Sequence, residues 1–420
     1  MNEIIFIVEE ARNADFSFEL LKNPNNKFSV STTYRTIDIY DTTLTTQTQT
    51  NTLLNRLEYS FNAFKRLLTS ATFYEIGTGH QQKQQYAYVW VGPGKGVYQY
   101  LGDLNGNGVQ DLNEFAMAQY PDQAIYIRVY TPTNVYVKDY TNRFNETIYI
   151  NPAAALGNKT TGFKKFISRF SDNATYSTDR KTTDNNLKSL FNPFQNAIAD
   201  TSLISTNASA RNSIYFNKTS SSWGIDYTIS DVRNKSLLAA GFDSRISTEN
   251  AVNTRWNVTR VIGLNLILKD GNKRSLSDYS PTSDYKIHYQ EMDPKISYQP
   301  NVSFRTSLLY SYIKKNNDPA LGGETAIENN IGTEVKYSTT TKGVLTAKFN
   351  YVKFNYNAPE NTQVAYAMLD GLHNGNNLTW GINLQRTLSG NMQLSLNYDG
   401  RKSEATNAIH TGSVQLRAYF

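Results

Sequence analysis

The residues best suited to chemistry lie between 103 and 114, where the chain reads Asp-Leu-Asn-Gly-Asn-Gly-Val-Gln-Asp-Leu-Asn-Glu. Ca²⁺ prefers six to eight hard oxygen ligands, and a twelve-residue loop supplies them at positions 1, 3, 5, 7, 9 and 12, with glycine at position 6 for the sharp turn. The glycine is Gly108. The sequence therefore predicts a calcium site whose ligands are Asp103, Asn105, Asn107, the carbonyl of Val109, Asp111 and Glu114.

The flanks of this loop differ from those of an EF-hand. Upstream, 85–91 and 96–100 alternate around Gly-Pro-Gly-Lys-Gly and predict a β-hairpin. Downstream, 112–119 is expected to be helical. No second loop accompanies the first, so a structural calcium ion is expected rather than a signalling one. The alternative is an Asn-Gly-rich turn without an ion.

The elements that must position this loop are strands. Apolar and polar residues alternate over 301–312 and 378–388, and period-two alternation of this length indicates strands. Runs of about 9–11 residues match strands that cross a membrane at a tilt. Leu308 and Leu394 are expected to face lipid, while Ser307 and Ser395 are expected to face a lumen.

The last strand, 411–420, carries Val414, Leu416 and Phe420 on one face and polar residues on the other. A strand of this kind that ends on an aromatic residue resembles the insertion signal of bacterial outer-membrane β-barrels. The expected partners are therefore outer-membrane lipid and the barrel-assembly machinery, the latter through the strand that ends at Phe420.

Connections of two lengths are expected between the strands. Two are tight, at 388–391 and 339–343, and two are long and polar, at 181–207 and 314–330. Barrels have short turns on one side and long loops on the other. The strand-like runs predict about 14 strands, within a range of 12–16, and aromatic residues at strand ends, Phe354 and Tyr356 among them, are expected to form interface girdles.

The fold prediction is an all-β, antiparallel transmembrane β-barrel with a small N-terminal β-module that carries the calcium-type loop. Residues 1–79 form either barrel strands or an accessory β-domain, 80–152 form the hairpin module, and 153–420 form the barrel. The N-terminal residues lack the basic start and apolar run of a signal peptide. We therefore expect the chain to be the C-terminal part of a longer product.

Composition excludes several classes of site. The chain has no Cys, which rules out disulfides and thiol zinc sites, and its net charge of +6 is spread without a basic run, so no nucleic-acid partner is expected. Aromatic residues reach 13%, with 29 tyrosines. This content suits a barrel, since aromatic rings gather at both membrane interfaces.

Three segments, 72–79, 98–115 and 127–133, resemble parts of large uncharacterised outer-membrane or cell-surface proteins of the Bacteroidota. The resemblance would cover only the C-terminal portion of those proteins. It implies an outer-membrane, cell-surface location in a Gram-negative bacterium and a C-terminal barrel, and it implies no known activity.

Three functions remain open from the sequence. The first is a non-enzymatic outer-membrane barrel that acts as a pore, translocation scaffold or surface-assembly component. The second is a soluble, secreted β-rich adhesion protein. The third and weakest is a barrel hydrolase with a rim active site, in which Asp284 and a lumen-facing His288 would work with nearby serines. The apolar face discriminates the first two, because it points to lipid in a barrel and into the core of a sandwich.

Overall fold

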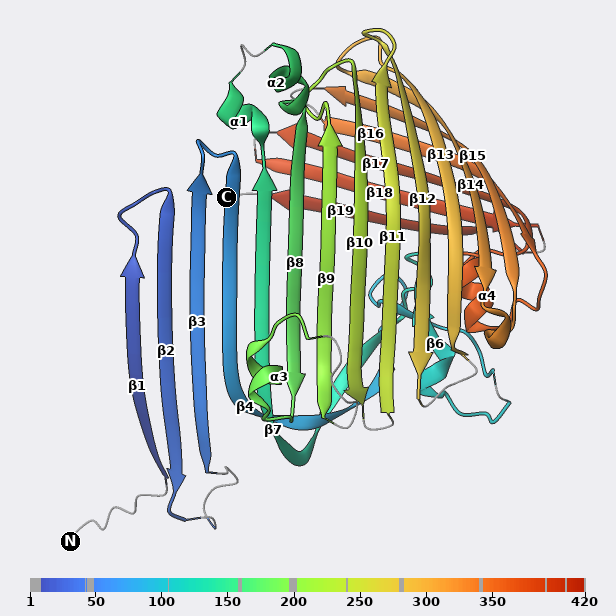
Figure 1. The fold of residues 1–420 in the computed structure, drawn as a ribbon. Helices are drawn as coiled ribbons and strands as arrows, with labels where there is room; N and C mark the ends of the chain where they lie inside the picture. Colours follow the sequence, from blue (N-terminus) through green and yellow to red (C-terminus); the bar gives the residue numbers. More distant parts are fainter. Residues whose placement is uncertain are drawn as a thin grey trace. The chain divides into compact units, whose positions relative to one another are not determined.

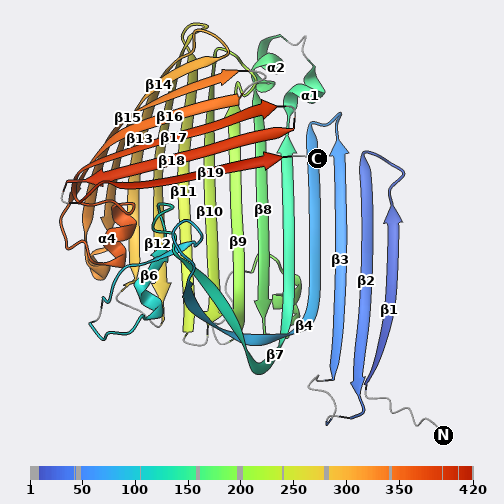
Figure 2. The ribbon, with the colours of Figure 1, turned by 180° about the vertical axis from the view of Figure 1, so that it is seen from behind.

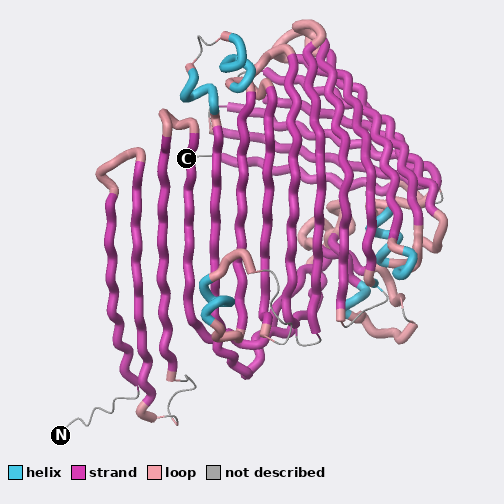
Figure 3. The backbone as a smooth tube through the Cα atoms, viewed as in Figure 1, coloured by secondary structure: helices cyan, strands magenta, loops and turns pink. Residues whose placement is uncertain are grey.

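A computed structural model describes the chain except for residues 1–8, 42, 44–48, 105, 158–160, 196–201, 239–240, 279–282, 340–342, 390, 405 and 419–420. The described residues form nineteen strands, which dominate the fold (Figures 1 and 3). The strands are β1 (Glu9–Leu20), β2 (Asn26–Ile39), β3 (Thr50–Ala63), β4 (Leu68–Trp90), β5 (Tyr98–Tyr100), β6 (Phe115–Met117), β7 (Tyr126–Ile150), β8 (Phe170–Thr182), β9 (Leu203–Phe216), β10 (Trp223–Leu238), β11 (Gly241–Asn257), β12 (Ile262–Ser277), β13 (Tyr285–Tyr298), β14 (Phe304–Asn317), β15 (Thr325–Thr339), β16 (Gly343–Tyr356), β17 (Gly375–Ser389), β18 (Met392–Ser403) and β19 (Ile409–Ala418).

Helices are few and short. They are α1 (Pro152–Leu156), α2 (Gly162–Ile167), α3 (Leu187–Phe191), α4 (Gln363–Met368) and the single 3₁₀ turns η1 (Leu112–Glu114) and η3 (Pro319–Leu321). Among the helices that the structure describes, none is long and apolar enough to cross a membrane.

The chain divides into two compact units, each built from separated segments. The first unit contains Met1–Gln85, Tyr130–Tyr215 and Ile229–Ile246, and the second contains Tyr86–Val129, Phe216–Thr228 and Ser247–Phe420. In the first unit β1, β2, β3 and β4 pair in sequence, and β7 pairs with β8, all antiparallel. The all-β, antiparallel prediction is confirmed.

In the second unit each strand from β12 to β19 pairs antiparallel with the next, which gives a continuous meander (Figure 2). Strand β15 ends at Thr339 and β16 begins at Gly343, while β17 ends at Ser389 and β18 begins at Met392, which leaves room only for the short connections that were expected. Residues 340–342 and 390 of these connections lie outside the described residues. Gly343 has φ +140°, and a side chain there would collide with the carbonyl oxygen of Gln385. Glycine is therefore required at this turn.

One predicted connection is wrong. The stretch 314–330 contains the end of β14 and the start of β15, and only 318–324 connects them. Polar residues occupy both faces of these strand ends, with Lys314 and Asn316 on one face and Lys315 on the other, so the alternation that identifies a strand is lost there. The long connection at 181–207 is present between β8 and β9. Within the described part of 153–420 there are twelve strands, β8 to β19, at the lower end of the predicted range.

The register of β12–β19 collects apolar side chains on one face, which we call the apolar face. Its rows run from strand to strand: Ile296 lies opposite Leu308, and Leu345 lies opposite both Tyr337 and Leu384. These side chains are exposed, with 57% of Leu308 and 70% of Val414 accessible. The exposed members include Ile262, Leu268, Met292, Ile296, Leu308, Ile331, Tyr337, Leu345, Phe349, Tyr351, Ile382, Val414 and Leu416.

The opposite face of the same strands, which we call the polar face, carries polar side chains that form hydrogen bonds between neighbouring strands. Ser297 Oγ and Ser307 Oγ lie 2.9 Å apart, and Asn350 Nδ2 donates to Thr379 Oγ1 at 3.2 Å. Ser307 is only 3% exposed, although its neighbour Leu308 is largely accessible. At this point of β14 the polar side chain is thus more enclosed than the apolar one, which is the reverse of the arrangement in a soluble sandwich.

A hydrophobic core occupies one end of the polar face. There β16 presents Val352, Phe354 and Tyr356, which pack with α4 residues Val364 and Met368. The prediction that Phe354 and Tyr356 belong to an aromatic girdle is therefore wrong. Both side chains are buried because their parity along β16 matches that of Lys348 and Asn350 on the polar face, and α4 covers this end of the strand.

Replacing Phe354 with Ala should lower the free energy of unfolding by about 3–5 kcal/mol, because the ring is 1% exposed and its removal leaves a cavity. The matched control is Phe349→Ala on the same strand, where the ring lies on the apolar face and is 46% exposed. Urea unfolding of both variants in detergent micelles checks this. Equal losses would contradict the assignment of the two faces.

Candidate functional site

The loop 103–114 connects two short strands that share a register. Strand β5 pairs with β6, with Tyr98 opposite Met117 and Tyr100 opposite Phe115, and Tyr98 also pairs with Tyr126 of β7. Leu101 N donates to Glu114 O at 2.8 Å and closes the loop. The loop is therefore carried by the β5–β6 hairpin rather than by a hairpin of 85–91 and 96–100.

An aromatic cluster anchors the end of the loop. Phe115 is 6% exposed and stacks on Tyr88 with ring centroids 4.0 Å apart. The rings of Tyr100 and Tyr126 also contact Phe115, and Tyr98 contacts Tyr88. The predicted helix over 112–119 is wrong, since only the single turn η1 forms before β6 begins. Burial of Phe115 in this cluster favours the extended conformation that pairs with β5.

The loop winds around the carboxylate of Asp103. Its Oδ1 accepts hydrogen bonds from Gly106 N at 2.7 Å and Asn107 N at 3.1 Å, and its Oδ2 accepts from Gly108 N at 2.7 Å. Gly106 and Gly108 both have φ +74°, a conformation that L-residues with side chains rarely adopt. The predicted turn glycine at 108 thus has the positive φ that the turn requires.

The remaining predicted ligands line the same loop. Asn107 Nδ2 donates to Asp111 Oδ2 at 2.6 Å, and Asn107 Oδ1 accepts from Val109 N at 2.7 Å. Glu114 is fully buried, and its two oxygens accept from Leu104 N at 2.9 Å and Asp111 N at 3.0 Å. A buried carboxylate needs such partners. Asn105 lies outside the described residues.

The donor set fits calcium in chemistry, because it combines carboxylate, amide and carbonyl oxygens around a tight glycine turn. The carboxylates of Asp103 and Glu114 point at main-chain amides in this conformation. In the described part of the chain, no group of three Asp, Glu, His or Cys side chains is arranged to hold a metal ion. Glu114 would have to exchange its amide contacts for the ion, so calcium binding remains a prediction.

The segment 119–123, which follows β6, forms an ion pair with β18 and hydrogen bonds with α4. Asp122 forms a two-pronged ion pair with Arg401 of β18, and the Arg401 guanidinium lies 4.5 Å from the ring centre of Tyr120. The side chains of Arg401 and Asp122 are 12% and 22% exposed. A cavity of about 300 Å³ adjoins the pair, lined among others by Lys348, Thr379 and Thr411.

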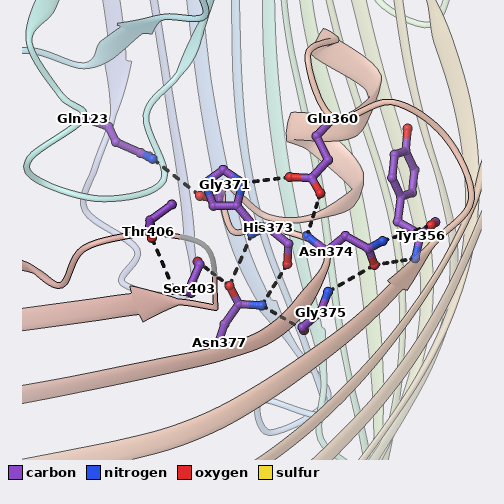
Figure 4. Close-up of polar contacts among 10 residues, drawn as sticks. All are labelled: Gln123, Tyr356, Glu360, Gly371, His373, Asn374, Gly375, Asn377, Ser403 and Thr406. Carbon is purple, nitrogen blue, oxygen red and sulfur yellow. Dashed lines mark hydrogen bonds and ion pairs between the residues drawn. The ribbon is translucent and has the colours of Figure 1, made fainter.

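Tyr366 of α4 holds the same segment from the other side. Its hydroxyl donates to Gln123 Oε1 at 2.9 Å and accepts from Gln119 N at 2.9 Å. Burial raises the pKa of Tyr366 to about 12, so the hydroxyl remains a donor near neutrality. Gln123 in turn reaches the carbonyl of Gly371 (Figure 4).

The turn after α4 is held by a polar network, drawn in Figure 4. The carboxylate of Glu360 contacts His373 Nδ1 at 2.7 Å and accepts from Asn374 N at 3.2 Å. Asn377 is fully buried and bonds to Ser403 and to the carbonyl of His373. The 119–123 segment therefore contacts α4 and a following turn that is itself held by hydrogen bonds.

His288 and Asp284, the residues of the hydrolase alternative, each contact other partners and not one another. His288 lies on the apolar face at β13 rather than on the polar face that was expected to line a lumen, since its parity matches Met292 and Ile296. Its Nε2 is 3.4 Å from Asp270, and its Nδ1 is 3.3 Å from Asn272. Asp284 instead accepts from Ser277 N at 2.8 Å.

Comparison with protein families and curated proteins gives no match. Solved structures give loose matches. The ferric-catecholate import receptor Fiu of E. coli K12 is 10% identical with a TM-score of 0.41, over 97% of this chain and 66% of that one. The FpvAI–pyocin S2 complex is 10% identical with a TM-score of 0.40, over 98% and 57%. The outer-membrane expressed OmpT of Vibrio cholerae is 7% identical with a TM-score of 0.32, over 84% and 89%. The chain spans less than two thirds of the first two proteins.

Calcium should protect the β5–β6 hairpin from proteolysis at about 10⁻⁴–10⁻³ M, the range of extracellular modules. Glu114→Gln should remove this protection, because the amide cannot give a bidentate anionic contact. Glu360→Gln, which changes a carboxylate outside the loop, should keep it. Cleavage near Gly106 is followed during a calcium titration. Absence of protection in the unaltered chain well above this range would mean that the loop is a turn only.

Removing one partner of the Asp122–Arg401 pair should release the 119–123 segment. Asp122→Ala leaves Arg401 largely enclosed and unpaired, and the cost should be roughly 2–3 kcal/mol, below that of a fully buried pair. Hydrogen exchange at Gln119 and Gln123 should accelerate. The double change Asp122→Ala with Arg401→Ala should cost less than the sum of the single changes. Additive effects would show that the two groups do not interact.

Proposed function

We propose that this chain forms the wall of an outer-membrane β-barrel, non-enzymatic, that acts as a pore, translocation scaffold or surface-assembly component. The observation that carries the proposal is the exposed apolar face of β12–β19. Soluble monomers rarely expose apolar patches larger than a few hundred Å². Here exposed Leu, Ile, Val, Phe and Tyr side chains form rows that continue across neighbouring strands, as at Leu308, Phe349 and Val414.

Lipid is the environment that such a face requires. Transferring apolar surface out of water is favourable by about 25 cal/mol per Å², so an exposed face of this kind is unfavourable in a soluble protein. In hydrocarbon the main-chain groups must also be paired, and antiparallel pairing between adjacent strands supplies this. The strand pairs β12–β19 meet both requirements.

The polar face suits a water-accessible lumen. Its side chains are joined by hydrogen bonds and ion pairs, as at Ser297–Ser307 and Lys295–Glu334, and such groups would be costly in contact with lipid. The soluble-sandwich alternative needs the apolar side chains to meet in a core, whereas Leu308 and Val414 are exposed.

Two further assignments belong to this proposal. The loop 103–114 would take a structural calcium ion that stiffens the β5–β6 hairpin. The barrel-assembly machinery would recognise the last strand, where Val414 and Leu416 of β19 lie on the apolar face. Phe420, the predicted end of this signal, lies outside the described residues.

Face-specific substitutions test the proposal. Leu308→Arg should destabilise the membrane-inserted form by about 2–4 kcal/mol if the residue lies near the midplane. Ser395→Arg places the same charge on the polar face, opposite Gln385 and Gln415, and should be tolerated. The readouts are the fraction of protein in outer membranes and heat-modifiable gel migration. A protein that stays soluble without detergent, or equal responses at both positions, would overturn the proposal.

A further inference from the structure

Three cationic side chains on the polar face of the second unit share a single carboxylate. Glu334 of β15 lies 3.3 Å from Arg305 Nη2, 3.5 Å from Lys348 Nζ and 3.9 Å from Lys295 Nζ. The cations come from β14, β16 and β13, so the strand register brings them together. The Glu334 side chain is only 14% exposed, while those of Lys295, Arg305 and Lys348 are 29%, 38% and 58% exposed.

Positive charge exceeds negative charge around this carboxylate. Lys336 adds a fourth cation, because it is two residues from Glu334 on β15 and lies directly opposite Arg305. The next carboxylates on this face belong to Asp293, two residues before Lys295, and to Asp399, which is separated from Lys348 by Gly381. Asp293 interacts with Glu291 on its own strand. Glu334 is therefore the immediate counter-charge of a cluster with several cations.

Hydrogen-bond donors in this cluster also exceed acceptors. Arg305 uses Nη2 on Glu334, whereas its Nε is enclosed and has no hydrogen-bond partner among the described residues. A guanidinium carries five N–H donors and an ammonium three, and one carboxylate cannot accept them all. Clustered cationic donors in excess of their acceptors attract an anion that can accept several hydrogen bonds.

We propose that the cluster of Lys295, Arg305, Lys336 and Lys348 is a binding site for a small oxyanion of the phosphate or sulfate type. The inference rests on the proposed barrel, where the polar face lines the lumen, and it deepens that function by naming anionic solutes as the class that the passage favours. Because the cluster lies on the face opposite the apolar one, the anion is a solute and not a lipid headgroup. Glu334 competes with the anion for the same donors.

Titration calorimetry with inorganic phosphate tests the site. The full chain is used in detergent, freed of calcium and at low ionic strength, since salt screens exposed charges. Lys348→Ala should weaken phosphate binding about tenfold, the effect of losing one charge-assisted contact. Lys353→Ala is the matched control, because Lys353 is exposed on the same strand but on the opposite face, opposite Asn329. The Lys353→Ala variant should bind phosphate with the same affinity as the unaltered chain.

Glu334→Gln should bind phosphate several-fold more tightly, because the resident competitor is neutralised while the cations stay. A purely structural role of Glu334 in holding the cations would give weaker binding and would overturn the proposal. No phosphate binding by the unaltered chain, or equal losses in Lys348→Ala and Lys353→Ala, would also overturn it. Heat-modifiable migration of each variant reports insertion separately, so failure of the barrel itself is distinguishable from failure of this site.

Discussion

The antiparallel main-chain pairing of β12–β19 is the constraint on which the second unit depends. Side chains alternate along a strand with a period of two, so a slip of one residue would move every side chain to the other face. With the observed register, Leu308 lies on the apolar face and Ser307 lies on the polar face. The ion pairs of Glu334, the core under α4 and the docking of 119–123 all require that register.

Strand β16 shows how one face can serve two environments. Its polar side runs from Lys348 and Asn350 to Val352, Phe354 and Tyr356 without a change of parity. Lys348 and Asn350 contact polar groups of neighbouring strands, whereas the three apolar side chains that follow pack against α4. The burial of a side chain on a strand thus depends on which element packs against that part of the face, as well as on which face the side chain occupies.

Sequence alternation predicts strands where one face is apolar and the other polar, and for that reason β14, β17 and β18 could be placed in advance. It fails near 314–330, where both faces are polar, and at Phe354, where a buried ring has the same pattern as an interface ring. For the calcium-type loop, spacing predicted a turn glycine at Gly108, which has φ +74°, whereas the calcium site itself stays a prediction. The Asp122–Arg401 contact joins residues 279 positions apart, and no local pattern announces such a pair.

The meander has a consequence for the order of assembly. Each strand from β12 to β19 pairs with its neighbour in sequence, so the wall can grow one hairpin at a time with little loop-closure entropy. The contact between Asp122 and Arg401 closes a far longer loop and needs β18 in place. The 119–123 segment is therefore synthesised before β18, but it can form its ion pair only after β18 has joined the sheet.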